Sequence, residues 1–406
     1  MPASTLTRSF RHPNYRLYVA GQLVSLTGTW MQNVAQAWLI YRLTDSSLAL
    51  GVAGFASQVP VFLLALLGGV LADRYPKRAL LLACSAVALV QAAVLAGLTL
   101  AGRVEVWQVV LMATLLGVVN AVEIPTRHSF VVEMVGKDDL HNAIALNSSM
   151  FHLARILGPS IAGVLVGLVG EGWCFAVNAL SFLAVMASLA SMRLEPVAAT
   201  SAMSGVGRHL WEGIAFAWRT PRVRAILALI AVASSMGASY LVLLPVFAGT
   251  VFGQGAGGLG MLTASAGLGS LAGALLMASR REARGLRRLA VWSCAGLGCA
   301  MALFARAPVF WAAAVLLAPA GFALMVLMAS CNTMLQLAAP DGLRGRVMAL
   351  YSMLYMGMAP FGALAAGWLA DVAGAQAAMT VMGACCLLGA LGPGRAIVAA
   401  GGTQAA

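Results

Sequence analysis

Long apolar stretches recur along the whole chain, and they restrict its fold more than any other feature of the sequence. A helix that crosses a bilayer needs about 20 mostly apolar residues, and stretches of this length follow one another with little polar chain between them. Of the 406 residues, 61% are hydrophobic and 9% are charged, a composition that soluble globular domains do not have. We therefore expect an all-α integral membrane protein without a separate soluble domain.

Twelve such stretches can be counted. We expect transmembrane helices at about 17–41, 48–72, 79–101, 106–124, 143–169, 173–192, 223–248, 257–279, 287–305, 309–330, 346–370 and 375–392. The first and fifth stretches also contain several polar residues. An even number of spans places both termini on the same side of the membrane.

The distribution of lysine and arginine gives the orientation of these spans. With this topology, 21 of the 25 basic residues lie on the side of the N-terminus, Arg42, Arg103 and Arg306 lie on the other side, and Arg155 lies inside a span. Because cytoplasmic loops are enriched in lysine and arginine, both termini are expected in the cytoplasm. The net charge of +12 arises from short clusters between apolar stretches, which favours the lipid bilayer over nucleic acid as a partner.

The second half of the sequence repeats the first. A shift of 204 residues aligns Ala145, Leu146, Ser148, Gly158, Ala162, Gly163, Leu165 and Gly170 with Ala349, Leu350, Ser352, Gly362, Ala366, Gly367, Leu369 and Gly374. The same shift aligns Gly69, Leu71 and Gly117 with Gly273, Leu275 and Gly321. We therefore expect two pseudo-symmetric six-helix bundles, at 1–192 and 223–406, joined by a cytoplasmic linker at 193–222.

The linker has an amphipathic pattern. Trp211, Ile214, Ala215 and Trp218 share one helical face, and Arg208, Glu212 and Arg219 lie elsewhere around the helix. This pattern fits a helix on the cytoplasmic membrane surface, and it fits a plain linker equally well.

A strong local motif, GGVLADRYPKR at 68–78, follows the second expected span. Small residues let a neighbouring helix approach closely, Asp73 offers a carboxylate to a helix N-terminus or a basic group, and Pro76 ends the helix. A basic loop with an incidental acid is the alternative. The motif resembles the loop between the second and third helices of the major facilitator superfamily, and the resemblance covers essentially the whole chain.

Other stretches resemble the branch of this superfamily that contains the enterobactin exporter and related drug and secondary-metabolite exporters. These stretches are EIPTR at 123–127, NAIALNS at 142–148, RILGP at 155–159 with Gly163, and RGRVMALY at 344–351. The resemblance implies secondary transport by alternating access in the cytoplasmic (inner) membrane of a bacterium. From the motifs we assign a conformational gate to Gly69, Asp73, Arg74, Lys77, Arg78, Gly158, Pro159, Gly163, Arg344 and Arg346.

Export by proton antiport is also an implication of the resemblance. GPSIAG at 158–163 is similar to the fifth-helix motif of antiporters in the superfamily, in which proline and glycines bend and thin the helix. Two features depart from the pattern. The expected fourth span, 106–124, lacks the arginine common among proton-coupled drug antiporters, and Met277 stands where Asp73 would repeat.

Ionisable residues inside a span cost roughly 2.5 to 3.5 kcal/mol or more at the bilayer centre, so those that persist usually face protein or water. His152 and Arg155 share one face of the fifth expected helix, and Glu123 is the nearest obvious carboxylate for Arg155. We hypothesise that Glu123 and Arg155 form an ion pair that senses protons or steadies the inner gate. A purely structural pair is the alternative.

A polar stripe on the first expected helix is a candidate wall of a central cavity. Its members, at steps of three or four residues, are Gln22, Ser25, Thr29, Gln32, Asn33 and Gln36. Hydrogen bonding between packed helices is the alternative. Weaker cavity candidates are Asn120, Asn147, Tyr240, Asn332, Gln336, Tyr351 and Tyr355. Amides and aromatic rings with few fixed charges suit bulky amphipathic solutes better than small ions.

Motifs of enzymes receive no support. GLGSLA at 267–272 matches a dinucleotide fingerprint, but it lies in an apolar span with no preceding strand and is expected to pack helices. There is no phosphate-binding GxxxxGK[ST] loop, no HExxH and no GxSxG. The seven cysteines lack the spacing of metal ligands and are expected in the core. We expect no enzymatic activity, cofactor or metal.

The sequence thus predicts a monomeric secondary active transporter that exports a small organic compound, such as a siderophore, drug or secondary metabolite, by proton antiport. Substrate binding is expected near the bilayer midplane between the two halves. Uptake by the same fold is the first alternative. A non-transporting receptor or an intramembrane enzyme would need a large soluble domain or a catalytic cluster, and the sequence has neither.

Overall fold

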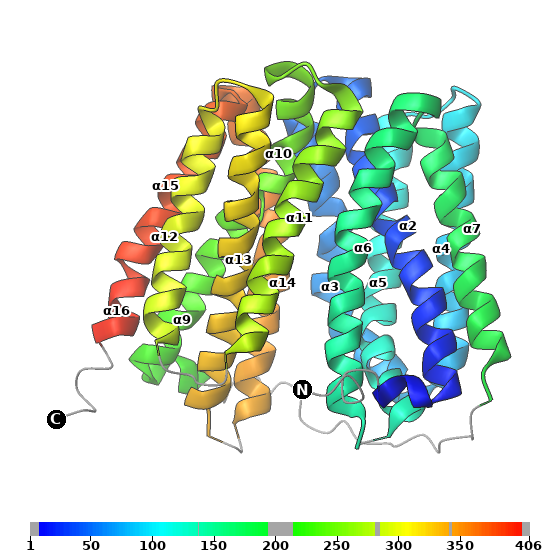
Figure 1. Ribbon diagram of the computed structural model, residues 1–406, viewed down its shortest axis with the longest axis horizontal. Coiled ribbons are helices and arrows are strands. Elements are labelled where there is room, and N and C mark those ends of the chain that lie inside the picture. The colour runs from blue at the N-terminus through cyan, green and yellow to red at the C-terminus, as the bar shows by residue number, and fades with distance from the viewer. Residues whose placement is uncertain (1–7, 137, 194–213, 281–284, 341–342, 400–406) are drawn as a thin grey trace. The chain divides into compact units, whose positions relative to one another are not determined.

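The computed structural model describes residues 8–136, 138–193, 214–280, 285–340 and 343–399, and this part of the chain contains helices and no strands (Figure 1). Contacts between residues divide the chain into two units. Unit 1 comprises Met1–Thr44 and Val59–Met203, and unit 2 comprises Asp45–Gln58 and Ser204–Ala406. Residues 45–58, which the sequence assigns to the first half, therefore belong to unit 2 by their contacts.

The helices are long, and loops between them are short. Unit 1 contains the 3-10 helix η1 (Arg8–Arg11) and the helices α2 (Pro13–Thr44), α4 (Lys77–Leu100), α5 (Val106–Val135), α6 (Leu140–Val169) and α7 (Glu171–Ser191). The helix α3 (Ser47–Arg74) begins in unit 2 and ends in unit 1.

Unit 2 contains the second set of spans. The helices that form them are α9 (Pro221–Val232), α10 (Tyr240–Val246), α11 (Gly255–Ser279), α12 (Leu286–Ala305), α13 (Phe310–Ala338), α14 (Arg344–Ala373), α15 (Ala375–Leu391) and α16 (Pro393–Ala399). Residues 214–219 of the expected linker are also helical, whereas Trp211, Arg208 and Glu212 lie outside the described residues.

Eleven described helical segments are long and apolar enough to cross a bilayer. The helix α2 is not among them, because amides such as Gln22 and Gln32 lower its mean hydropathy. Its 32 residues nevertheless give it a length of about 48 Å, more than the hydrocarbon core of roughly 30 Å. With α2 as the first span, the fold is the expected all-α membrane protein of twelve transmembrane helices.

Three expected spans differ most from the observed helices. The fourth, expected to end at residue 124, continues to Val135, and the tenth, expected to end at 330, continues to Ala338. Both extensions contain polar side chains, which made the sequence-based limits too short. The seventh is interrupted by the π-helical segments η2 (Ala233–Gly237) and η3 (Phe247–Val251).

The helix limits repeat with the sequence. The helices α6 and α14 each contain 30 residues and differ by 204 at both ends, from 140 to 344 and from 169 to 373. The helices α7 and α15 begin 204 residues apart, at 171 and 375. The sequence repeat therefore reflects a repeat of helices, as expected from duplicated six-helix bundles.

Glycine allows close backbone contacts within unit 2. A Cβ atom added to Gly269 on α11 would lie 1.8 Å from the carbonyl oxygen of Ala318 on α13, and one added to Gly321 on α13 would lie 2.0 Å from that of Ala266 on α11. Side chains at these glycines would therefore separate the two helices. The GLGSLA motif at 267–272 contributes to this contact and packs helices, as expected.

Candidate functional site

The motif at 68–78 forms the end of α3, a short turn and the start of α4. A Cβ atom at Gly68 would lie 2.0 Å from the carbonyl oxygen of Ala121 on α5, whereas no atom lies within 4 Å of the corresponding position at Gly69. Gly68 is therefore the close-packing glycine, rather than Gly69, which the motif had assigned to the gate. Asp73 and Arg74 are exposed at the end of α3.

The basic residues after Pro76 bind neighbouring helices of unit 1. Lys77 forms an ion pair with Glu133 on α5, and both side chains are 20% exposed. Arg78 donates hydrogen bonds to the carbonyl oxygens of Ala190 (2.7 Å) and Met192 (3.2 Å) at the end of α7. Carbonyl groups in the last turn of a helix lack helical partners, so Arg78 caps α7. The loop is thus fixed to two helices.

The glycine and proline motif of α6 brings that helix close to α2. A Cβ atom at Gly158 would lie 2.5 Å from Cβ of Trp30 and 2.7 Å from the carbonyl oxygen of Thr27. Pro159 lies inside the helix, and Gly163 is buried. A larger side chain at position 158 would force α6 away from α2.

The expected ion pair between Glu123 and Arg155 is wrong. Oε1 of Glu123 lies 3.6 Å from Nε of Arg127, one turn further along α5. The side chains are 20% and 11% exposed, respectively. The sequence-based limit at residue 124 excluded Arg127 from the span, although α5 continues beyond it.

The hydroxyl group of Tyr18 on α2 is buried, has no hydrogen-bond partner among the described residues and interacts electrostatically with both charged groups. We call Tyr18, Glu123 and Arg127 the acid–arginine cluster.

Arg155 instead has an aromatic partner. Its guanidinium carbon lies 5.6 Å from the ring centroid of Trp30 on α2, a cation–π geometry. His152, on the preceding turn of α6, is 8% exposed, and its Nδ1 has no hydrogen-bond partner among the described residues. Phe151 makes edge contacts with Trp30 and with His152.

The polar stripe of α2 divides between different environments. Gln22, Ser25, Gln32 and Gln36 are buried, Thr29 is half-buried and Asn33 is exposed. Gln32 donates to Oε1 of Gln91 on α4 (3.2 Å) and accepts from Nδ2 of Asn178 on α7 (2.7 Å), and Ser181 donates to Oδ1 of Asn178 (2.9 Å). This amide cluster joins three helices of unit 1. For Gln32 it favours hydrogen bonding between packed helices over a cavity wall.

Four of the weaker cavity candidates lie together on α13 and α14 of unit 2. The rings of Tyr351 and Tyr355 stack with centroids 5.9 Å apart and an interplanar angle of 19°. Gln336 donates to Oδ1 of Asn332 (2.6 Å), and the side chain of Asn332 is hydrogen-bonded to Tyr351. Nε of Arg344 donates to the carbonyl oxygen of Gln336 (3.2 Å). We call Asn332, Gln336, Tyr351 and Tyr355 the tyrosine–amide patch.

The remaining candidates are more dispersed. Tyr240 is fully buried at the start of α10, so it belongs to the core of unit 2. Asn120 on α5 and Asn147 on α6 are half-buried, and Arg346 is half-buried in the first turn of α14.

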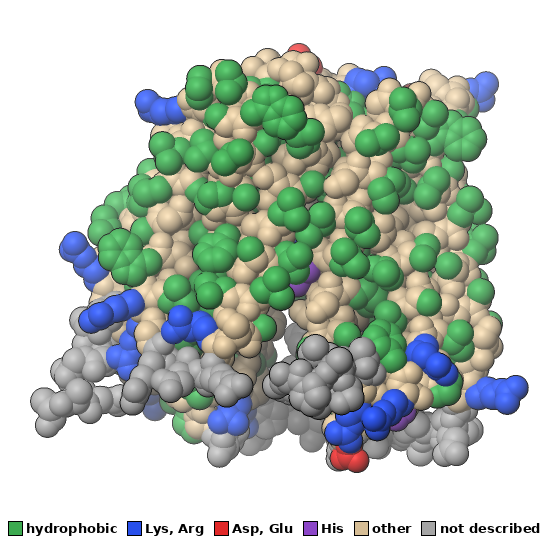
Figure 2. All heavy atoms as spheres, in the orientation of Figure 1, with side chains coloured by type: hydrophobic (Ala, Val, Ile, Leu, Met, Phe, Trp, Pro, Cys, Tyr) green, Lys and Arg blue, Asp and Glu red, His purple; other side chains and the backbone are tan. Residues whose placement is uncertain are grey.

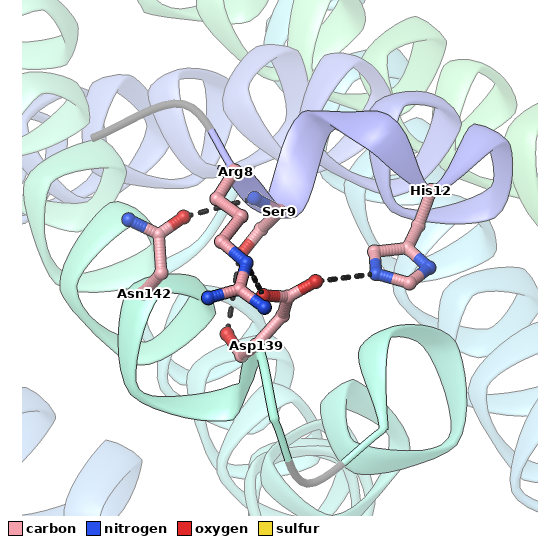
Figure 3. A network of polar contacts seen from close by, with 5 residues as sticks. All are labelled: Arg8, Ser9, His12, Asp139 and Asn142. Atoms are coloured by element: carbon pink, nitrogen blue, oxygen red, sulfur yellow. Dashed lines mark hydrogen bonds and ion pairs between the residues drawn. The ribbon is translucent and has the colours of Figure 1, made fainter. Parts of the chain in front are cut away.

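A polar network that the sequence did not indicate connects the N-terminus to the loop between α5 and α6 (Figure 3). Asp139 contacts Nε of Arg8 (2.6 Å) and Nε2 of His12 (2.9 Å). The backbone N–H of Ser9 donates to Oδ1 of Asn142 (3.0 Å), and its hydroxyl donates to the carbonyl oxygen of Asp139 (3.2 Å). The hydrogen bond with His12, followed by the charge of Arg8, lowers the pKa of Asp139. Partners about 130 residues apart leave no local pattern in the sequence.

The described residues contain no group of three or more histidine, cysteine or acidic side chains that would hold a metal ion. The seven cysteines are free thiols, and five of them are buried.

Known proteins resemble the chain over most of its length. The chain is 26% identical over 382 residues to the multidrug efflux pump Tap of Mycolicibacterium fortuitum, covering 92% of each protein. It is 24% identical to the enterobactin exporter EntS of Shigella flexneri, covering 84% of this chain and 81% of that protein. A segment covering 43% of this chain is 26% identical to the staphyloferrin A transporter of Staphylococcus aureus.

Solved structures share the fold. A bacterial homologue of the human lysosomal transporter Spinster has a TM-score of 0.74 at 14% identity, covering 98% of each chain. The nucleoside transporter NupG has a TM-score of 0.75 at 12% identity, covering 94% of this chain and 98% of that chain. Residues 3–399 match the family described as transmembrane secretion effector. The chain therefore belongs to this family of major facilitator superfamily transporters.

Proposed function

We propose that the protein is a proton antiporter that exports a small organic compound across the inner membrane of a bacterium, by alternating access and as a monomer with both termini in the cytoplasm. The direction of transport is supported by relatives of similar length named as an efflux pump and an exporter. The excess of basic residues on the side of the termini supports the orientation.

The single observation that carries the proton-coupled mechanism is the acid–arginine cluster. Glu123 is an ionisable carboxylate in a membrane span with Arg127 as its partner at 3.6 Å, beyond ordinary hydrogen-bond distance. Such residues in transmembrane helices commonly belong to proton or substrate pathways. Protonation of Glu123 would remove the negative charge beside Arg127. The net charge of the cluster would therefore differ between its two protonation states. His152 and Arg155 lie on α6, which contacts α5 and α2, and form the second candidate group.

The tyrosine–amide patch is the proposed substrate contact in unit 2. Stacked phenol rings provide a flat apolar surface, and the amides of Asn332 and Gln336 provide donors and acceptors. Tyr355 is 42% exposed, so its ring is accessible. This chemistry favours a flat amphipathic compound. In unit 1, Asn33 and Thr29 on α2 are the proposed cavity residues, since their side chains are not buried like that of Gln32.

The proposed gate joins the loop after α3 to α5 and α7 and includes the close contact of α6 with α2. The ion pair of Lys77 with Glu133 and the hydrogen bonds of Arg78 support this assignment, because breaking them would free the loop. Arg344 and Arg346 occupy the repeat-related start of α14 and are the gate candidates of unit 2.

The test is transport in proteoliposomes containing the purified full-length chain, with an imposed pH gradient and either an aromatic cationic dye or a catecholate siderophore. We expect export of the dye or the siderophore by the wild type. Gradient-driven transport by Glu123→Gln should be at least roughly tenfold slower, because proton transfer by one positioned side chain typically contributes a factor of 10² or more to a rate. Glu105→Gln, in the exposed N-cap of the same helix, is the matched control and should transport normally.

Two results would reject parts of this proposal. Full gradient-driven transport by Glu123→Gln would remove Glu123 from proton coupling. Accumulation in the direction of uptake under the same gradient would reverse the assigned direction and favour an importer of the same fold.

A further inference from the structure

Arginines collect at one end of unit 2, where α9 and α12 begin. Arg222 and Arg224 lie in the first turn of α9, and Arg287 and Arg288 lie in the first turn of α12. Arg395 is exposed on α16, which contacts both helices. The lower ends of α9, α12 and α16 lie together in Figure 1, and Lys and Arg side chains gather over them in Figure 2. We call these five residues the arginine end.

No internal anion neutralises the arginine end within the described part of the chain. The described carboxylates of unit 2 are Asp45, before α3, and Asp371, near the end of α14, and neither forms an ion pair with these arginines. Neither α9 nor α12 has an acidic residue in its first turn or a side-chain cap. Arg222 experiences electrostatic repulsion from Arg287, and its Nε atom is buried without a hydrogen-bond partner among the described residues.

Among the described residues, this arrangement places like charges close together without a neutralising acid. The N-terminus of a helix carries partial positive charge, so basic side chains in the first turn oppose it. Free N–H groups of two helix starts and several guanidinium groups together form the donor set that recognises a phosphate group. A phosphate bound between Arg222 and Arg287 would relieve their repulsion and satisfy the buried Nε.

The surroundings point to a phosphate at a membrane surface. The apolar spans begin at Pro221 and Leu286, so the arginine end lies at the level of lipid headgroups. Trp218 and Trp292 are 71% and 74% exposed, and the guanidinium carbon of Arg224 lies 5.8 Å from the ring centroid of Trp218. Exposed tryptophans of membrane proteins are enriched at the interface between lipid and water, and basic pockets there bind anionic headgroups.

We propose that the arginine end of unit 2, centred on Arg222 and Arg287, binds the phosphate of an anionic membrane phospholipid. The phosphate is held by guanidinium groups, and the acyl chains lie along the apolar surfaces beside Trp218 and Trp292. The proposal is independent of the transported compound.

The test measures lipid retained by the purified full-length protein in detergent after incubation with an equimolar mixture of phosphatidylglycerol and phosphatidylcholine. We expect phosphatidylglycerol to be enriched on the wild type. The double variant Arg222→Gln/Arg287→Gln should bind it about thirtyfold more weakly, the effect expected for two arginines near a membrane surface. Arg306→Gln is the matched control, because Arg306 is exposed at the other end of α12. It should retain the wild-type preference.

A second variant and a competitor keep the result interpretable. Arg222→Lys/Arg287→Lys keeps both charges and should recover most of the preference even where the glutamine variant is less stable. Inorganic phosphate at millimolar concentration should leave phosphatidylglycerol bound; displacement by it would overturn the lipid assignment in favour of a soluble anion. Equal enrichment on the wild type and on a monodisperse glutamine variant would overturn the site itself.

Discussion

The two units neutralise their basic residues differently. All ion pairs between described residues lie in unit 1, where Asp139, Glu171, Glu133 and Glu123 contact arginine, lysine or histidine. In unit 2 the arginines at the start of α9 and α12 have no such acid among the residues that the structure describes. Duplicated bundles with repeating helix limits have thus kept their geometry while their charges diverged. Among the described residues, internal ion pairs hold the loops of unit 1, whereas the arginine end of unit 2 has none.

The most prominent packing contacts of the two units differ as well. Unit 1 has a buried amide cluster between α2, α4 and α7. Unit 2 relies strongly on glycines that bring backbones into contact, between α11 and α13, between α12 and α15 through Gly298 and Gly383, and between α14 and η2 through Gly362. Without a hydrophobic driving force between helices in lipid, close packing and hydrogen bonds are the two remaining sources of specificity. Both units use both means, but the buried amide cluster is found in unit 1, and the three glycine contacts named here are found in unit 2.

The largest effect is expected from Gly269→Ala, which tests the dependence of unit 2 on backbone contact. The added Cβ atom would lie 1.8 Å from the carbonyl oxygen of Ala318, so α11 and α13 must separate. Overpacking of this kind costs about 1–3 kcal/mol or more. We expect a clearly lower melting temperature in detergent, measured by fluorescence-detected size exclusion after heating.

Gly296→Ala on α12 is the control, since no atom lies within 4 Å of its added Cβ. It should keep the wild-type melting temperature or raise it slightly, because alanine favours a helix interior over glycine by up to about 1 kcal/mol. If both variants melted at the same temperature, close backbone contact would not be what holds α11 against α13.

A smaller effect is expected from Asn178→Ala, which tests the amide cluster of unit 1. The substitution leaves Oε1 of the fully buried Gln32 without its donor. An unsatisfied buried polar group costs about 1–3 kcal/mol. We therefore expect lower thermal stability. Asn33→Ala, at the exposed neighbour on α2, should leave stability unchanged and, on the proposed function, slow transport. If Asn178→Ala slowed transport without lowering stability, and Asn33→Ala lowered stability without slowing transport, Gln32 would be assigned to the cavity wall instead.

The helices and their repeat followed from the sequence because the length of an apolar stretch is a local property. The sequence did not show which residues of a helix face its neighbours. Gln32 and Asn33 are adjacent on α2, yet one is buried and the other exposed, and Gly68 rather than Gly69 meets α5. These differences depend on the rotation of each helix against its neighbours. The partner of Glu123 was missed because the charged end of α5 appeared too polar to belong to the span.

The smallest effect is expected at the polar network of unit 1 formed by Arg8, Ser9, His12, Asp139 and Asn142. The hydrogen bond with His12 and the charge of Arg8 lower the pKa of Asp139 in the folded state. The contact therefore stabilises the protein above the unfolded pKa of about 3.9, and this contribution is lost as pH falls through the lower folded value. Between pH 7 and 5 the melting temperature of the wild type should be slightly higher than that of Asp139→Asn, and the two melting temperatures should converge below about pH 4.

Asp138→Asn, at the exposed preceding residue, should follow the wild type throughout. A difference between wild type and Asp139→Asn that stayed constant into strong acid would show that the charge of Asp139 does not hold the N-terminus to this loop.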